Sequence, residues 1–333
     1  MKLLITGGAG FMGSNFIKHI FKNHPNWQVV NLDKLTYAGN LDNLKEVGDS
    51  PNYFFVRGDI ANKEDVKAAI GQGVDKIINF AAETHVDRSI LEPDAFIKTD
   101  IFGTYTLLEA ARENNVAQYI QISTDEVFGS IKNGSFSESS PFAPNSPYSA
   151  SKAGADHLCR AYFKTYNLPV IVTHSCNFYG PSQYPEKLIP LFITNLLENK
   201  KVPVYGEGNQ MREWIFTEDY CRAIDLIIER GQVGEIYNIG TGYEKQNIEI
   251  TKFILAELGF DESMIEYVKD RPAHDFRYSI NCEKLRGLGW KSEIPWDEGL
   301  RRTIKWYQEN EWWWKKLKSG EYLDYYKKQY QSR

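Results

Sequence analysis

Tyr148 and Lys152 form the residue pair whose types and spacing most clearly allow chemistry, in the run S-P-Y-S-A-S-K from 146 to 152. In a helix, residues four apart lie on one face, so both side chains would point into one site. A phenol has a reference pKa near 10, and a nearby ammonium group can favour the phenolate. The pair is a candidate proton-transferring base, although a solvated helix face is the simpler interpretation of two common residues.

A second candidate group is Thr124, Asp125 and Glu126, inside the stretch Ser123–Gly129. It directly follows a predicted strand, Gln118–Ile122, and ligands of parallel sheets bind beyond such strand ends. Neighbouring carboxyl groups in different environments can hold different protonation states, so that one serves as acid and the other as base. The alternative is that both acids only stabilise the start of the next turn.

The N-terminus contains a third pattern, G-x-x-G-x-x-G, formed by Gly7, Gly10 and Gly13. It stands between a predicted strand, Leu3–Thr6, and a predicted helix from Ser14 to Lys22. A glycine-rich turn lets the backbone approach a pyrophosphate, and the helix N-terminus offers free N–H donors. The pattern therefore indicates dinucleotide binding, whereas a merely tight turn is the plain alternative.

Asp33 extends this pattern, because it ends a predicted strand, Gln28–Leu32, and lies 20 residues after Gly13. A carboxylate at that place can accept hydrogen bonds from a ribose 2′-hydroxyl and would repel a 2′-phosphate. The sequence thus favours NAD over NADP, unless Asp33 only caps its strand.

Strand and helix patterns alternate through the first half of the chain. The predicted strands are Leu3–Thr6, Gln28–Leu32, Tyr53–Arg57, Lys76–Phe80, Gln118–Ile122 and Val170–His174, and the longer predicted helices are Pro93–Glu113 and Pro147–Tyr166. This alternation predicts an α/β fold, a Rossmann-type doubly wound parallel sheet with helices on both faces. The residues at one rim of that sheet would be Asp33, Asp59, Ala81, Ala82 and Ser123 to Glu126.

The pattern changes after about residue 175, where prolines divide the chain into short segments. We expect residues 1–175 to form the dinucleotide-binding domain and residues 176–333 to form mainly a smaller C-terminal substrate-binding lobe. One later segment, Glu235–Ile239, resembles another strand of the main sheet. The aromatic tail Trp306–Tyr330 is expected to be a terminal helix packed on the body, rather than a basic aromatic binding surface.

Composition excludes several classes of function. A net charge of −5 gives no reason to expect nucleic acid or an anionic membrane as a partner. The sequence has no run of 18 apolar residues, and a strand begins within two residues of Met1, so we expect neither a membrane span nor a signal peptide, and a cytoplasmic location. The four cysteines, which should be buried thiols, and the histidines show no metal-binding spacing, so no metal is expected.

Taken together, these motifs resemble the extended short-chain dehydrogenases/reductases, and more narrowly the dTDP-glucose 4,6-dehydratase family. That family carries an acidic pair after the catalytic threonine, as here, whereas GDP-mannose dehydratases usually have serine at position 125. Further matching stretches are 33–40, 81–89, 177–181, 185–190, 271–275 and 320–322. The resemblance covers essentially the whole chain. Departures from the family pattern are Thr84 for serine, Phe178 for asparagine, Ala273 for glycine and Phe276 for arginine.

The resemblance implies a hydro-lyase that uses NAD as a recycled cofactor and dTDP-glucose as substrate, for the supply of a deoxysugar such as rhamnose. Tyr148 would take the proton of the sugar 4-hydroxyl, Lys152 would support it, and Thr124 would hold the 4-oxygen. Glu126 would remove the C5 proton while Asp125 protonates the departing 6-hydroxyl. The hydride taken from C4 would then return to C6, giving a 4-keto-6-deoxy sugar nucleotide.

The resemblance also implies two sets of binding residues. For the cofactor these are Gly7, Gly10, Phe11, Met12, Gly13, Asp33, Lys34, Leu35, Thr36, Asp59, Ile60, Ala81, Ala82, Thr99, Tyr148, Lys152 and Phe178. For the substrate they are Thr84, His85, Thr124, Asn177, Lys187, Leu188, Pro203, Tyr205, Arg212, Asn247, Arg271 and His274. His85 is expected to order the site rather than to do chemistry, and Arg212 could instead be a surface ion pair.

Two other functions remain open at this point. A nucleotide-sugar 4-epimerase or decarboxylase of the same fold would need Thr124, Tyr148 and Lys152 but has no use for the two acids. A non-catalytic dinucleotide sensor would keep the glycine turn and lose the catalytic residues, which are intact here. The family resemblance further implies a homodimer formed through the helices at 93–113 and 147–166.

Overall fold

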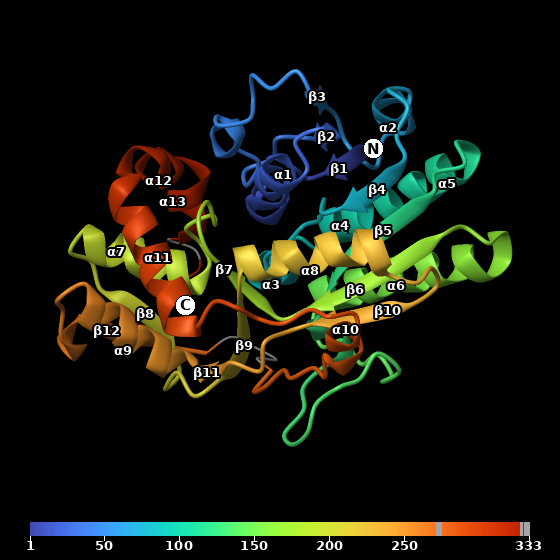
Figure 1. Cartoon of the computed structure of the whole chain (residues 1–333). Coiled ribbons are helices and arrows are strands. Elements are labelled where there is room, and N and C mark those ends of the chain that lie inside the picture. The colour runs from blue at the N-terminus through green and yellow to red at the C-terminus, as the bar shows by residue number, and fades with distance from the viewer. Residues whose placement is uncertain (271–274, 327–328, 330–333) are drawn as a thin grey trace.

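The computed structural model of the chain describes residues 1–270, 275–326 and 329. Its centre is a seven-stranded sheet with the order β10-β6-β5-β4-β1-β2-β3, in which every neighbouring pair is parallel (Figure 1). The strands are β1 (Lys2–Thr6), β2 (Gln28–Asp33), β3 (Tyr53–Arg57), β4 (Lys76–Asn79), β5 (Gln118–Thr124), β6 (Val170–Ser175) and β10 (Ile236–Ile239). The predicted Rossmann-type parallel sheet is therefore confirmed.

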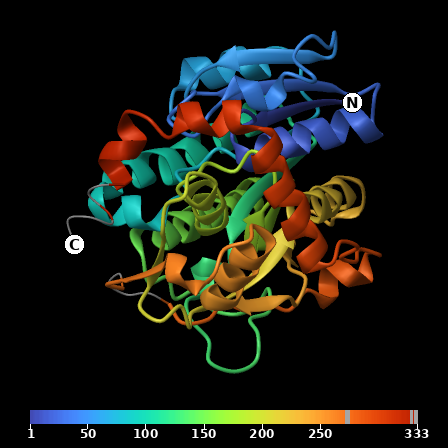
Figure 2. The ribbon, with the colours of Figure 1, turned by 90° about the vertical axis from the view of Figure 1, so that its left-hand side faces the viewer.

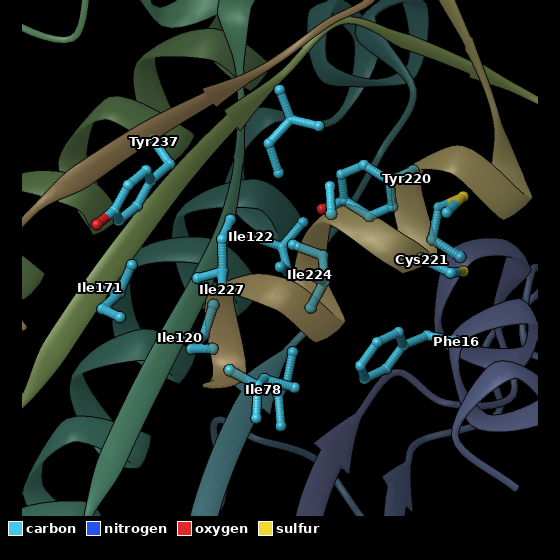
Figure 3. Close-up of a cluster of buried hydrophobic side chains, with 14 of the residues drawn as sticks. Phe16, Ile78, Ile120, Ile122, Ile171, Tyr220, Cys221, Ile224, Ile227 and Tyr237 are labelled. Carbon is cyan, nitrogen blue, oxygen red and sulfur yellow. The ribbon is translucent and has the colours of Figure 1, made fainter. Parts of the chain in front are cut away.

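Helices cover both faces of this sheet because its strands are apolar on both sides. Apolar residues of α1 (Phe11–Asn23) and α8 (Thr217–Arg230) pack on one face. Those of α2 (Lys63–Ile70), α5 (Thr104–Glu113) and α6 (Pro147–Tyr166) pack on the other. Figure 3 shows the first of these layers, with Ile224 and Ile227 of α8 facing Ile78 and Ile120 of the sheet.

Helix α6 has the bounds that the sequence predicts, and its ends show why. Ser146 and Ser149 form a reciprocal capping box at the N-terminus, and Pro147 occupies the first turn, where a missing N–H costs nothing. At the other end Asn167 adopts a left-handed conformation with φ +54°. Both ends of the helix that carries Tyr148 and Lys152 are thus fixed by local sequence.

Two predicted helices differ from those observed. Helix α1 begins at Phe11, three residues before the predicted Ser14, because Gly10 serves as N-cap and the last glycine of the motif already lies in the first turn. The predicted helix 93–113 divides into α4 (Pro93–Phe96), a π-helical segment η2 (Ile97–Gly103) and α5. A π segment places an extra residue in the turn, which no hydrophobic period reveals.

The second half of the chain builds a separate apolar cluster beside the sheet. Its strands form a three-stranded sheet, β7 (Asn177–Tyr179), β9 (Met211–Phe216) and β11 (Glu244–Gln246), and a pair, β8 (Val202–Tyr205) and β12 (Ile265–Val268). Its helices are α7 (Leu188–Leu197), α9 (Asn247–Glu257) and α11 (Trp296–Glu309). The remaining short elements are η1 (Leu41–Leu44), α3 (Val86–Leu91), η3 (Asp125–Phe128), η4 (Glu262–Met264) and α10 (Glu283–Gly287). The division at residue 175 stays a prediction.

The aromatic tail packs on the body, as predicted, but as more than one helix: α11 is followed by α12 (Glu311–Leu317) and α13 (Glu321–Tyr326). Trp313 and Trp314 are buried. Trp313 Nε1 donates to Asn43 Oδ1 at 2.8 Å, so the end of the chain is tied to its beginning. Figure 2 shows these red helices lying beside the blue N-terminal segment.

Several predictions from composition meet the structure here. All four cysteines, Cys159, Cys176, Cys221 and Cys282, are buried free thiols, as predicted. Among the described residues, no helix combines the length and apolar character needed to cross a membrane. The ligand atoms of His24, Asp225 and Glu229 lie within 4.8 Å of one another, so the absence of a metal site stays a prediction.

Candidate active site

A cavity of about 320 Å³ opens at the carboxyl ends of the central strands. Nearly all residues predicted to bind a cofactor line it: Gly7, Gly10, Phe11, Met12, Gly13, Asp33, Lys34, Thr36, Asp59, Ile60, Ala81, Ala82, Thr99, Tyr148, Lys152 and Phe178. Leu35 is the exception among them, since its backbone N–H instead binds Asp33 Oδ1 at 2.8 Å. The sheet thus gathers residues that are up to 171 positions apart in the sequence, from Gly7 to Phe178.

The glycine turn between β1 and α1 needs glycine at two positions for steric reasons. Gly7 has φ +65°, and a Cβ there would lie 2.7 Å from the backbone nitrogen of Ala81. A Cβ on Gly13 would lie 2.3 Å from the carbonyl oxygen of Gly7. Both contacts are to backbone, which cannot move aside cheaply. Glycine at these positions therefore lets the turn fold tightly while it lines the cavity, which is the arrangement that lets a pyrophosphate approach the backbone.

Asp33 at the end of β2 is buried and holds the turn together. Its Oδ2 accepts from the backbone N–H of Ala9 at 2.9 Å, and its Oδ1 accepts from that of Leu35. Burial raises its pKa, although these two hydrogen bonds act against the rise. Each carboxylate oxygen has a second lone pair, so this structural role leaves acceptor capacity for a ribose hydroxyl.

Tyr148 and Lys152 both reach the cavity from α6, but their electrostatics differ from the prediction. Lys152 Nζ donates to the carbonyl oxygen of Ile122 at 2.6 Å. Burial, followed by the negative charges of Glu126 and Asp100, raises the pKa of Tyr148 well above 10, and a hydrogen bond with Thr124 only partly offsets this. Burial and the two carboxylates therefore favour the neutral phenol in the chain by itself, and the role of Tyr148 as a base stays a prediction.

The acidic pair lies in η3, directly after β5. The Thr124 side chain caps this turn by accepting the N–H of Glu126 at 3.2 Å, so the capping role falls to the threonine rather than to the acids. Asp125 is buried, and Thr124 Oγ1 donates to its Oδ1 at 3.3 Å. Burial, then the charges of Glu126 and Glu213, raises the pKa of Asp125 well above its ordinary value. These surroundings favour the protonated form of Asp125 beside Glu126.

A smaller cavity of about 160 Å³ adjoins the first. Predicted substrate-binding residues line it: His85, Asn177, Lys187, Leu188, Pro203, Tyr205, Arg212 and Asn247. Glu126, Asn177, Lys187 and Leu188 line both cavities, and Thr84 and Thr124 line the larger one. The two cavities therefore meet beside Glu126, and Asp125 lines only the larger one. Arg271 and His274, together with the departure Ala273, lie outside the described residues.

Arg212 belongs to this smaller cavity and not to the surface. It is buried, its guanidinium lies over the Tyr278 ring at 4.4 Å, and it donates to the carbonyl oxygens of Asp275 and Phe276 at 2.9 and 3.2 Å. The alternative of a surface ion pair is wrong. His85 is also buried, and burial lowers its pKa to about 4, so it is neutral near pH 7.

Sequence reasoning missed several residues of the two cavities: Glu83, Gln183, Glu186, Trp214 and Tyr278. Glu186 accepts from Arg88 Nε at 3.0 Å and from the Tyr37 hydroxyl at 2.9 Å, so it joins the two halves of the cavity wall. The sequence shows Glu186 between Pro185 and Pro190. It does not show the two partners, because Arg88 and Tyr37 lie about 100 and 150 residues earlier in the chain. Phe178 packs on the Tyr220 ring at 4.5 Å.

This fold and this site define a class, and comparison with known proteins confirms it. The family model described as GDP-mannose 4,6 dehydratase matches residues 4–303. The dTDP-glucose 4,6-dehydratase of Streptomyces niveus is 48% identical over 324 residues, which cover 96% of each chain. The chain therefore belongs to this dehydratase family, and within it to the dTDP-glucose 4,6-dehydratases that the sequence motifs resemble.

Solved structures agree with this placement. The dTDP-glucose 4,6-dehydratase of Streptomyces venezuelae, determined with NAD bound, has a TM-score of 0.93 and 49% identity, covering 95% of this chain and all of its own. The UDP-glucose 4-epimerase of Thermus thermophilus, also in complex with NAD, has a TM-score of 0.87 but only 27% identity, covering 93% of this chain and 100% of its own. The chain is thus closer to the dehydratase than to this epimerase of the same fold.

Proposed function

We propose that this chain is a hydro-lyase that converts dTDP-glucose to dTDP-4-keto-6-deoxyglucose with NAD as a recycled cofactor. One observation carries the proposal: Asp125, a buried acid whose surroundings favour its protonated form, stands next to Glu126, which lines both cavities, and Tyr148 lines the larger cavity with them. An acid–base pair at this place serves the removal of water, and a 4-epimerase has no use for it.

The larger cavity fits NAD in the features that a dinucleotide requires. The glycine turn and the N-terminus of α1 line the cavity, and Asp33 retains acceptor capacity. When bound, NAD supplies a positively charged nicotinamide that accepts a hydride from sugar C4 and gives it back at C6. Lys152 would bind the nicotinamide ribose, and Asp59 with Lys34, 2.9 Å apart, would line the adenosine end.

Three groups handle the oxygen at sugar C4. Thr124 Oγ1 would hold that oxygen by a hydrogen bond, and Tyr148 would take the proton from the 4-hydroxyl. The raised pKa of Tyr148 means that this proton transfer needs positive charge close to the phenol, which Lys152 supplies in part. The positive charge of bound NAD would add to that of Lys152. Tyr148 would therefore act as a base only when the cofactor is bound.

Loss of water then uses the acidic pair. The ketone at C4 acidifies the C5 proton, Glu126 removes it, and Asp125 donates its own proton to the departing 6-hydroxyl. The division of labour follows from the environments of the two carboxyl groups, because burial and the neighbouring charges raise the pKa of Asp125 and favour its protonated form. After the proton on Glu126 has exchanged with solvent, Glu126 can give a solvent-derived proton to C5 as the hydride reaches C6.

The nucleotide would occupy the smaller cavity. A diphosphate needs cationic donors, and Arg212 and Lys187 line this cavity. Tyr205, Asn247 and Pro203 line its far part and would contact the nucleoside. Asn177 and Leu188, which line both cavities, would lie against the hexose.

Incubation of the chain with dTDP-glucose and with UDP-glucose tests the reaction. We expect dTDP-glucose to lose the mass of one water, and deuterium placed at C4 to appear in the new methyl group at C6. In deuterated water, solvent deuterium should enter at C5, which an epimerase would not cause. A product without the C4 label in its methyl group would overturn the proposal.

The variant Glu126→Gln gives a sharper test of the assigned base. It keeps the size of the side chain and removes its basicity, so elimination should slow by roughly 10²–10⁴-fold while C4 oxidation continues. The measurement is rapid mixing at 340 nm, where absorbance from the reduced cofactor should persist. Turnover at the wild-type rate would show that Glu126 is not the base.

We also propose that the chain works as a cytoplasmic homodimer. Apolar side chains are exposed on neighbouring helical segments: Ile90 and Leu91 of α3 are 38% exposed, and Ile97 and Phe102 of η2 are 51% and 46% exposed. Segment η2 packs on α6, so these residues flank the predicted helix pair. A second copy of the chain would cover them.

A further inference from the structure

A buried polar group lies beneath the acidic pair and has no part in the proposed reaction. Asp156 of α6 is one helical turn beyond Lys152, and its side chain points back toward the sheet. Its Oδ2 accepts from Ser123 Oγ at 2.7 Å and lies 3.1 Å from His174 Nε2. All three side chains are buried. A carboxylate only accepts, so the hydroxyl and the imidazole N–H both donate to one oxygen.

The three residues link helix α6 to two adjacent strands of the sheet. Ser123 of β5 and His174 of β6 are direct partners in the register of the two strands, so Asp156 bridges the pair from the helix above. Ser123 immediately precedes Thr124. Helix α6 therefore contacts the end of β5 twice, through Asp156 at Ser123 and through Lys152 at the carbonyl oxygen of Ile122.

The imidazole extends the contact to η3. The His174 ring meets the edge of the Phe128 ring at 4.8 Å and the Phe142 ring at 5.5 Å. Phe128 is the last residue of η3, the turn that carries Asp125 and Glu126. A chain of direct contacts thus runs from Asp156 through His174 to the far end of the acidic turn, and through Ser123 to its near end.

We propose that Asp156 is a positioning residue that, through Ser123 and His174, fixes the acidic turn η3 relative to Tyr148 and Lys152. This inference rests on the proposed dehydratase reaction and deepens it. Asp156 touches neither substrate nor cofactor in the proposed reaction. Its effect should fall on the step that needs Asp125 and Glu126, because a misplacement of about 1 Å can cost roughly 10²-fold in rate.

Rapid mixing with dTDP-glucose separates the two steps, since absorbance at 340 nm rises with oxidation at C4 and falls with hydride return after elimination. Asp156→Ala should slow the fall by roughly tenfold or more and the rise by less than about threefold. Asp156→Asn should recover most of the rate that Asp156→Ala loses. Its amide oxygen can still accept hydrogen bonds from Ser123 and His174. Asp156 Oδ1 has no hydrogen-bond partner, so an amide nitrogen in its place would break no existing hydrogen bond.

Two further variants protect the test. Ser123→Ala removes one donor without unfolding a helix, and it should shift the same ratio in the same direction by a smaller factor. Tyr162→Phe is the matched control, because it removes a hydrogen bond of 2.6 Å from another face of α6 to Glu109. It should lower the melting temperature and leave the ratio of the two rates unchanged.

The outcomes are distinct. If wild type forms no dehydrated product, the proposed function fails. If wild type is active but Asp156→Ala and Ser123→Ala slow both phases equally, or neither phase, the positioning role is overturned and Asp156 only stabilises the fold.

Discussion

The raised pKa of Asp125 suits the role of proton donor proposed for it, but it also lowers the stability of the folded chain as pH rises. Burial and neighbouring acids raise its pKa, so the folded chain binds a proton there that the unfolded chain releases above about pH 4. With more protons bound in the folded state, the stability contributed by this group falls as pH rises from about 4 toward the raised pKa. The residue proposed to donate the proton for water loss therefore lowers the stability of the folded chain at pH values above about 4.

The variant Asp125→Asn should change both the stability of the chain and its rate of dehydration. Asparagine keeps the shape and does not titrate, so the variant should be more stable than wild type, by a margin that grows as pH rises above about 4. It should also lose most of its dehydration rate. Thermal melting from pH 4 to 8 measures the first effect, and a margin that shrank as pH rose would contradict the assigned direction.

Asp100 is the second residue whose charge matters, because it faces Tyr148 from η2. Burial raises its own pKa to about 6, so it is charged at pH 7, and that charge raises the pKa of Tyr148. Asp100→Asn should lower the pKa of Tyr148 and shift the pH dependence of C4 oxidation to lower pH. Asp94→Asn, an exposed acid on α4, is the control and should leave the profile in place.

At the scale of elements, the turn from β1 to α1 depends on the missing side chain of Gly13. Gly13→Ala would place a methyl group 2.3 Å from the Gly7 carbonyl oxygen, so the turn must open. We expect NAD to bind at least about tenfold more weakly, or roughly 1.4 kcal/mol. Calorimetric titration of NAD checks this. Gly48→Ala, whose added Cβ would lie 3.4 Å from its nearest neighbour, should bind normally.

The elements also explain which predictions from the sequence held. Strands of a parallel sheet are buried on both faces, so they appear in the sequence as short apolar runs. The observed bounds of β3 and α6 are those that the sequence predicts. The ends of α6 were predictable because Ser146 and Pro147 are strong local signals. The π-helical segment η2 and the early start of α1 could not be predicted from the sequence, because they follow from packing and from the conformation of glycine.

At the scale of the whole molecule, the exposed apolar residues of α3 and η2 predict self-association. Phe102→Asp places a charge in the proposed contact and should halve the mass measured by light scattering after gel filtration, with a folded chain by circular dichroism. Leu323→Asp is the control, since Leu323 is 42% exposed on α13 and belongs to none of the segments α3, η2 and α6. A wild-type chain of 38.4 kDa in solution would refute the dimer.

The sequence alone determined the order of the strands along the chain, the glycine turn, the acid at the end of β2 and the pair on α6. These features are local, because each depends on residues within a few positions of one another. It also indicated the family, since the motifs occur in the order and at the spacing that this chemistry requires.

Only the tertiary structure decided the electrostatics. The pKa of Tyr148 is set by Glu126 and Asp100 as well as by burial, and these residues are 22 and 48 positions away in sequence. The buried Arg212 and the Asp156 bridge likewise depend on partners brought together by folding. Charge interactions act through space and grow as water is excluded, so no spacing along the chain could have given their sign or size.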